Sequence, residues 1–260
     1  GLGDVYKRQP YHRVSLLVTW DSILRIRIFG KAVVISYANK LTKQNKYTKL
    51  SMRHITLMAH QSSPLNCVYS SNLPEILNYI GCTLVISTYQ AGKIIFVSAV
   101  DTNNLIQLPF GFHRPMGVAA TGDLLAVATR DTVEVLADSP ELSSTDLKRF
   151  GMHDRLYAPQ TTYFSGEVNM HDLVWGNDGL WGVNTLFSCL VLANNTLSFE
   201  PKWFPSFITE SVGEDRCHIN GLALEAGRPR YVTALGESNT EKGWRRYKVS
   251  GGILIDVYIN

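Results

Sequence analysis

From residue 84 onward, the chain alternates short apolar runs with turns that contain glycine. Four of these runs share one pattern and end in Thr or Ala: 84-LVIST-88, 125-LAVAT-129, 181-WGVNT-185 and 230-RYVTA-234. Short apolar runs bounded by turn residues are typical of β-strands. The ends of the four runs are 41, 56 and 49 residues apart. The pattern therefore predicts an all-β protein with a recurring unit.

Three of these runs form the second half of a hairpin. Residues 114–129, 169–185 and 218–234 each contain a polar lead-in, an apolar strand, a turn with glycine and a second strand. A third strand follows each hairpin. Recurrence of such a unit every 40 to 55 residues is typical of a β-propeller, whereas a Greek-key sandwich would not repeat the same hairpin with the same lead-in. We predict a partial propeller over residues 58–260, with about three to four blades.

One short helix is expected before the first strand, over residues 72–81. Asn72 can cap its first turn, Pro74 and Glu75 suit that turn, and Gly81 can end the helix.

The net charge of the chain changes sign near residue 57. Residues 1–57 carry 11 Lys and Arg against two Asp, a net charge of +9, whereas residues 58–260 carry −6. Clustered basic residues can bind nucleic acid or an anionic membrane. However, the opening GLGDVYKRQ resembles a translated sequencing-adapter tail, and Met52 or Met58 would serve as a native start. We expect residues 1–57 to be non-native or disordered, and neither nucleic acid nor a membrane to be a partner.

The four cysteines, Cys67, Cys82, Cys189 and Cys217, are widely spaced and form no CxxC pair. This spacing favours reduced thiols that pack in a core over a zinc site or a redox pair. The apolar runs 14–20 and 32–38 are shorter than the roughly 20 residues that a membrane-spanning helix needs, and the sequence contains no convincing secretory signal. We expect a cytoplasmic protein.

Polar residues recur in the lead-ins of the hairpins. In a propeller, the innermost strand of each blade runs beside the central channel, so the residues before these strands meet at one channel mouth. In the shared frame, Arg114 matches Asn169 and His218, and Met116 matches His171 and Asn220. The frame thus predicts one candidate ligand pocket from separate blades, formed by Tyr89, Gln90, His113, Arg114, His171, Asp172, His218 and Asn220.

Several motifs in this order, including 114-RPMGVA-119, 171-HDLVWGNDGLWGVNTLFSCL-190 and 251-GGILIDV-257, resemble an uncharacterised conserved-hypothetical bacterial family. That family is classed as a domain of unknown function and is similar to six-bladed β-propellers. The resemblance covers about residues 65–257. It implies a propeller of the six-bladed type that continues past Asn260, so we expect a fragment; it implies no established reaction.

Two functions from different classes fit these residues. One is a binding module that presents its channel mouth to a small molecule, a glycan or a protein. The other is a metal-dependent hydrolase, since 218-HINGLA-223 is similar to the Asn-Gly-Leu-Ala segment of gluconolactonase-type propellers. That similarity implies a divalent cation held by Asp172 and Asn220, because hard cations take oxygen ligands. The metal ligand set is incomplete, so we favour the binding module.

Two further segments have alternative interpretations. His171 and Asp172 fit a ligand pocket, a catalytic dyad, or a structural role in which they hydrogen-bond backbone groups between blades; we favour the structural role. The basic, aromatic segment 243-GWRRYK-248 fits contact with phosphate or sugar, or a solvated loop anchored by Trp244. We favour the loop.

Overall fold

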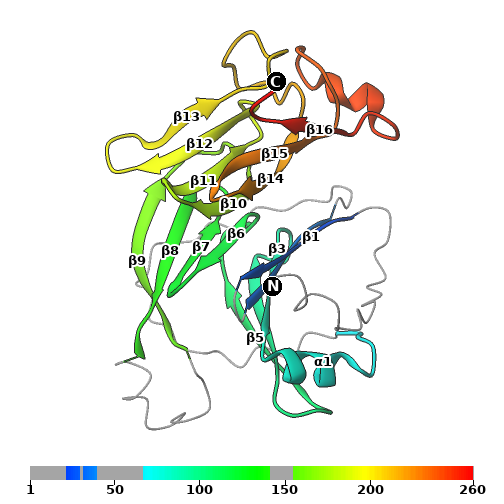
Figure 1. The fold of residues 1–260 in the computed structure, drawn as a ribbon, viewed down its shortest axis with the longest axis vertical. Helices are drawn as coiled ribbons and strands as arrows, with labels where there is room; N and C mark the ends of the chain where they lie inside the picture. Colours follow the sequence, from blue (N-terminus) through cyan, green and yellow to red (C-terminus); the bar gives the residue numbers. More distant parts are fainter. Residues whose placement is uncertain (1–21, 30–31, 40–66, 141–154, 260) are drawn as a thin grey trace, which may run out of the picture.

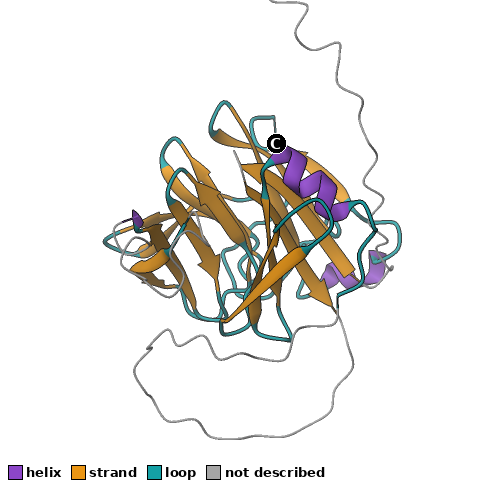
Figure 2. Cartoon of the chain, turned by 90° about the horizontal axis from the view of Figure 1, so that it is seen from below, coloured by secondary structure: helices purple, strands orange, loops and turns teal. Residues whose placement is uncertain are grey.

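The protein is all-β, with four small sheets that follow one another along the chain (Figure 1). The computed structural model describes residues 22–29, 32–39, 67–140 and 155–259. Strands make up most of these residues, and the short helices lie at the margins of the strand layers (Figure 2).

Each sheet is formed by strands that are consecutive in the sequence. The first contains β1 (Ser22–Phe29), β2 (Ala32–Asn39), β3 (Thr83–Thr88), β4 (Lys93–Ala99) and β5 (Leu105–Gly111). The second contains β6 (Val118–Thr121), β7 (Leu124–Ala128), β8 (Thr132–Asp138) and β9 (Tyr157–Phe164). The third contains β10 (Met170–Gly176), β11 (Gly179–Asn184), β12 (Cys189–Asn194) and β13 (Ser198–Trp203). The fourth contains β14 (Ile219–Glu225), β15 (Arg228–Ala234) and β16 (Ile253–Asp256).

Neighbouring strands pair antiparallel, except that β2 and β3 pair parallel. The predicted hairpins are present as β6–β7, β10–β11 and β14–β15. Their local sequence explains this outcome: apolar residues alternate on both sides of a turn in which Gly122, Gly179 or Gly227 adopts a positive φ.

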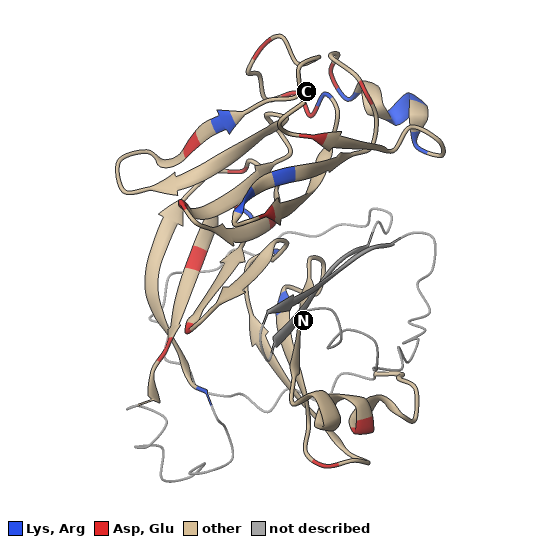
Figure 3. Ribbon diagram, viewed as in Figure 1, with Lys and Arg blue, Asp and Glu red and all other residues tan. Residues whose placement is uncertain are grey.

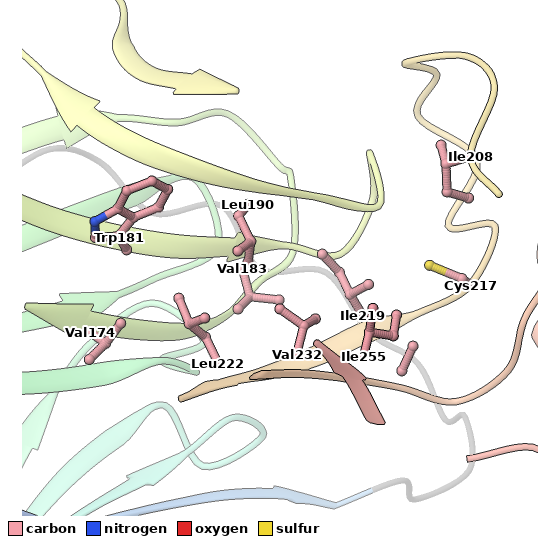
Figure 4. Packing of buried hydrophobic residues seen from close by; sticks show 11 residues of the cluster. Val174, Trp181, Val183, Leu190, Ile208, Cys217, Ile219, Leu222, Val232 and Ile255 are labelled. Atoms are coloured by element: carbon pink, nitrogen blue, oxygen red, sulfur yellow. The ribbon is translucent and has the colours of Figure 1, made fainter. Parts of the chain in front are cut away.

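Apolar side chains join each sheet to the next one along the chain. The first and second sheets share a buried cluster that includes Val85, Ile94, Val118, Leu125 and Val127. The second and third share Ala126, Val133, Met170, Leu173 and Leu180. The third and fourth share Val183, Leu190, Leu222, Val232 and Ile255 (Figure 4). Because burial of each such side chain contributes about 1.5–3 kcal/mol, these clusters fix the order in which the sheets pack.

The predicted helix is present as α1 (Leu73–Ile80), and Gly81 ends it with a φ of 61°. Asn72 occupies the N-cap position but makes no side-chain cap hydrogen bond. Leu77 is buried, whereas Ile80 is exposed. A second short helix, the 3-10 helix η1 (Gly243–Tyr247), follows β15. Of the helices in the described ranges, none has the length and apolarity required to cross a membrane.

Two predictions about architecture stay predictions. The described sheets form no closed ring, so they establish the all-β class but leave the propeller untested. Strands β1 and β2 fall within residues 1–57, and the rest of that segment lies outside the described residues. That residues 1–57 are non-native or disordered stays a prediction.

Candidate functional site

The same backbone turn precedes the first strand of the second, third and fourth sheets. Arg114, Asn169 and His218, which match in the sequence frame, have φ values of 52°, 53° and 54°. The carbonyl before each turn accepts a bond from the strand partner: Arg130 N to His113 O, Leu186 N to Val168 O, and Leu235 N to Cys217 O, at 2.9, 3.1 and 3.2 Å. A positive φ costs energy for any residue other than glycine, least for Asn and Asp. The chain therefore repeats the same strained backbone turn at three matching positions.

A β-bulge follows the turn in both the third and the fourth sheet. The pairing of β10 with β11 shifts between Met170 and Asp172, and the pairing of β14 with β15 shifts between Ile219 and Gly221. The residues left without a ladder partner are His171 and Asn220, which match in the frame. A bulge re-aims the side chain of the extra residue, and here it brings these two side chains together.

His171, His218 and Asn220 form a compact polar cluster at the start of β10 and β14. The Nδ1 of His171 lies 2.9 Å from the Oδ1 of Asn220. The rings of His171 and His218 meet edge to face, with centroids 4.9 Å apart. Because an amide oxygen can only accept, the Nδ1 of His171 donates, and this fixes the proton of the neutral ring on Nδ1.

Asp215 completes the cluster, and sequence reasoning missed it. The Nδ1 of His218 donates to its carboxylate oxygens at 2.8 and 3.0 Å, and the indole Nε1 of Trp244 donates to Oδ2 at 3.1 Å. Trp244 also packs against His218, with ring centroids 4.4 Å apart. The signal in the sequence was the Asp-x-x-His spacing of Asp215 and His218. Both residues adopt a left-handed backbone conformation, and this turn brings their side chains into contact.

The carboxylate of Asp172 lies between the third and fourth sheets. Its oxygens accept from the backbone N–H of Leu173 and of Leu222, each at 3.0 Å, and the residue is 2% exposed. Gly117, at the start of the second sheet, approaches the backbone of Asp172 so closely that a Cβ there would lie 2.9 Å from it. Asp172 thus bonds backbone groups of neighbouring sheets, as its predicted structural role requires.

The remaining predicted residues lie around the start of the second sheet and contact other groups. Arg114 lies over the ring of Tyr89, 5.8 Å from its centroid, and the exposed His113 is 3.8 Å from Asp131. Gln90 is exposed next to Tyr89. The convergence of all eight predicted residues in one pocket stays a prediction, whereas His171, His218 and Asn220 are in contact.

The oxygens predicted to bind a cation are engaged in hydrogen bonds. Asp172 accepts from two backbone groups, and Asn220 Oδ1 accepts from His171. Within the described ranges, no three His, Cys, Asp or Glu side chains gather as a metal site would require. The divalent cation stays a prediction, and the geometry adds no ligand to the two that were proposed.

Three of the four cysteines, Cys82, Cys189 and Cys217, are buried. Burial raises the pKa of Cys189 to about 12 and that of Cys217 to about 11. Thiols with such pKa values stay protonated near neutral pH and are poor nucleophiles. Both residues pack in the apolar clusters between sheets, as the sequence predicted.

No curated protein matches the chain. The family described as a domain of unknown function, DUF4915, matches residues 71–260, close to the range of the resemblance noted above, and the chain belongs to this family.

Proposed function

We propose that this chain is a binding module of the β-propeller type that recognises a small ligand at the histidine cluster, formed by His171, Asp215, His218, Asn220 and Trp244. Four sheets packed in chain order, three of them preceded by the same left-handed turn, support the propeller. The observation that carries the function is the convergence of His171 and His218 from two sheets.

The hydrogen bonds within the cluster hold the His218 ring in one orientation. Its Nδ1 proton is committed to Asp215, so the Nε2 of the neutral ring is an acceptor. The His218 side chain retains 15% of its surface exposed, so solvent reaches part of the ring. A polar group held in one orientation at a partly exposed position loses little entropy on binding, which favours ligand recognition.

The metal-dependent hydrolase remains the alternative. It requires Asp172 and Asn220 to exchange their present hydrogen bonds for a cation, and no observation in the described residues favours this exchange. A calcium or zinc titration that raises the melting temperature of the wild type, and fails to do so after Asp172→Ala or Asn220→Ala, would make it the leading function.

The binding proposal is tested by thermal shift against a library of sugars, sugar acids, amino acids and nucleotides. A ligand present at 100 times its Kd stabilises the folded state by about 2.7 kcal/mol, which shifts Tm by several degrees. We expect His218→Asn to abolish the shift. Asn is suitable because Asn169 has the matching φ of 53°, so the turn itself is preserved.

The matched control is His113→Asn, which removes an exposed histidine beside the equivalent turn of the second sheet. Hits should stabilise this variant as they do the wild type. Hits that stabilise wild type and His218→Asn equally, or a library without any hit that depends on His218, would contradict the proposal.

A further inference from the structure

The histidine cluster continues into η1 through Trp244. This indole is 2% exposed, its Nε1 bonds Asp215, and its ring packs on His218. The 3-10 helix is therefore held against the site by its one buried aromatic residue, and the residues that flank Trp244 lie beside the cluster.

Two cations lie over the same indole ring. The guanidinium carbon of Arg245 is 5.5 Å from the centroid and the Nζ of Lys248 is 5.9 Å from it. Both residues are exposed. Cation–π attraction keeps the two charges near the cluster, and Figure 3 shows basic residues gathered on η1.

Four acidic side chains nearby are bonded to other groups. Lys242 pairs with Glu241 at 2.5 Å, and Arg216 pairs with Glu210 and Glu214 at 3.2 and 2.9 Å. The carboxylate of Asp215 is bonded by His218 and Trp244. In the described part of the chain, Arg245 and Lys248 themselves form no ion pair within 4 Å, so their charges are available to a ligand.

We infer that the ligand of the histidine cluster carries an anionic group, a carboxylate or a phosphate, which Arg245 and Lys248 bind while His218 contacts the remainder. The inference rests on the proposed binding function. A guanidinium and an ammonium group are the side chains that proteins use most for both anions, because charge-assisted hydrogen bonds are short and strong. The two exposed cations, Arg245 and Lys248, thereby select a negatively charged ligand.

The test follows the indole N–H resonance of Trp244 in the full chain during titration at constant ionic strength. The probes are glucuronate, glucose 6-phosphate, inorganic phosphate and neutral glucose, with sodium chloride as the reference salt. We expect saturable shifts with at least one of the carboxylate and phosphate probes and none with glucose or chloride. The glucuronate and phosphate arms then distinguish the two anions.

The Arg245→Gln/Lys248→Gln double variant should raise the Kd of the anion by roughly tenfold or more, because both charge-assisted hydrogen bonds to the anion are lost. The matched control is Arg246→Gln, which removes one exposed charge from the same helix without a described contact to Trp244. It should leave the Kd within about twofold. Absence of a saturable shift, or an unchanged Kd in the double variant, would overturn the inference.

Failure of this inference and failure of the proposed function have different signatures. Ligand binding that His218→Asn abolishes but the double variant leaves intact would retain the binding function and refute the anionic ligand. Anion binding that depends on Arg245 and Lys248 but tolerates His218→Asn would retain the anion site and refute the shared site at His218.

Discussion

Removal of the Asp172 carboxylate should weaken the attachment of the third sheet to the fourth. Its bond to the Leu222 N–H joins residues of β10 and β14 across 50 positions of sequence, whereas its bond to Leu173 is local. A hydrogen bond to a charged group contributes about 1.5–3 kcal/mol, and loss of a buried acceptor adds a desolvation penalty. We expect Asp172→Ala to lower the free energy of unfolding by about 3 kcal/mol. Asp172→Asn retains one acceptor oxygen, and we expect about half of that loss.

Urea unfolding measures the loss, and an unchanged m value shows that the variant unfolds from the same compact state. Amide exchange at Leu222 gives a local measure, since it should accelerate in Asp172→Ala. Asp178→Ala is the matched control, because Asp178 is an exposed carboxylate in the turn of the same hairpin and should change stability by less than about 0.5 kcal/mol. Equal stability of the two variants, or unaltered exchange at Leu222, would refute the role assigned to Asp172.

Three further predictions follow from the packing. Gly117→Ala should destabilise the protein by about 1–3 kcal/mol, because the new Cβ would meet the Asp172 backbone at 2.9 Å; urea unfolding should show no such loss for Gly111→Ala, which has open space around it. The free energy of unfolding should fall as pH rises above about 9, by about 1.4 kcal/mol per pH unit for each thiol. The reason is that unfolded Cys189 and Cys217 ionise near 8.5, while their folded pKa values are about 12 and 11. A double Cys→Ala variant that keeps the full alkaline loss would contradict this. Trp244→Phe should cost about 1 kcal/mol by removing one donor to Asp215, and an unchanged urea midpoint would argue against that bond.

The hairpins and their frame could be predicted because they depend on local patterns. Alternation of apolar residues, a glycine turn and a polar lead-in are all readable within about 17 residues of sequence, and β10–β11 formed where 169–185 predicted them. The outer strand β9 was not predicted. Most of its residues from Gln160 to Phe164 are exposed, so they carry no apolar period that would mark a strand.

The site was predicted in part, for the same physical reason. The frame placed His171, His218 and Asn220 in the lead-ins of successive hairpins, and the lead-ins of the third and fourth sheets lie side by side. It could not identify the bond between Asp215 and Trp244, since that contact depends on how the loop carrying η1 folds back over 29 residues. Nor could it show that Asp172 bonds the Leu222 backbone, because bulge geometry leaves no periodic signal.

The central claim is that His218, oriented by Asp215, contacts a ligand. Its most direct test is a long-range proton–nitrogen spectrum of the histidine rings, recorded with and without the best hit of the library. We expect both the His171 and the His218 ring to carry a proton on Nδ1, and the resonance of the Nε2 of His218 to change when ligand binds. A His218 ring protonated on Nε2 alone, or one whose resonances stay fixed at saturating ligand, would contradict it.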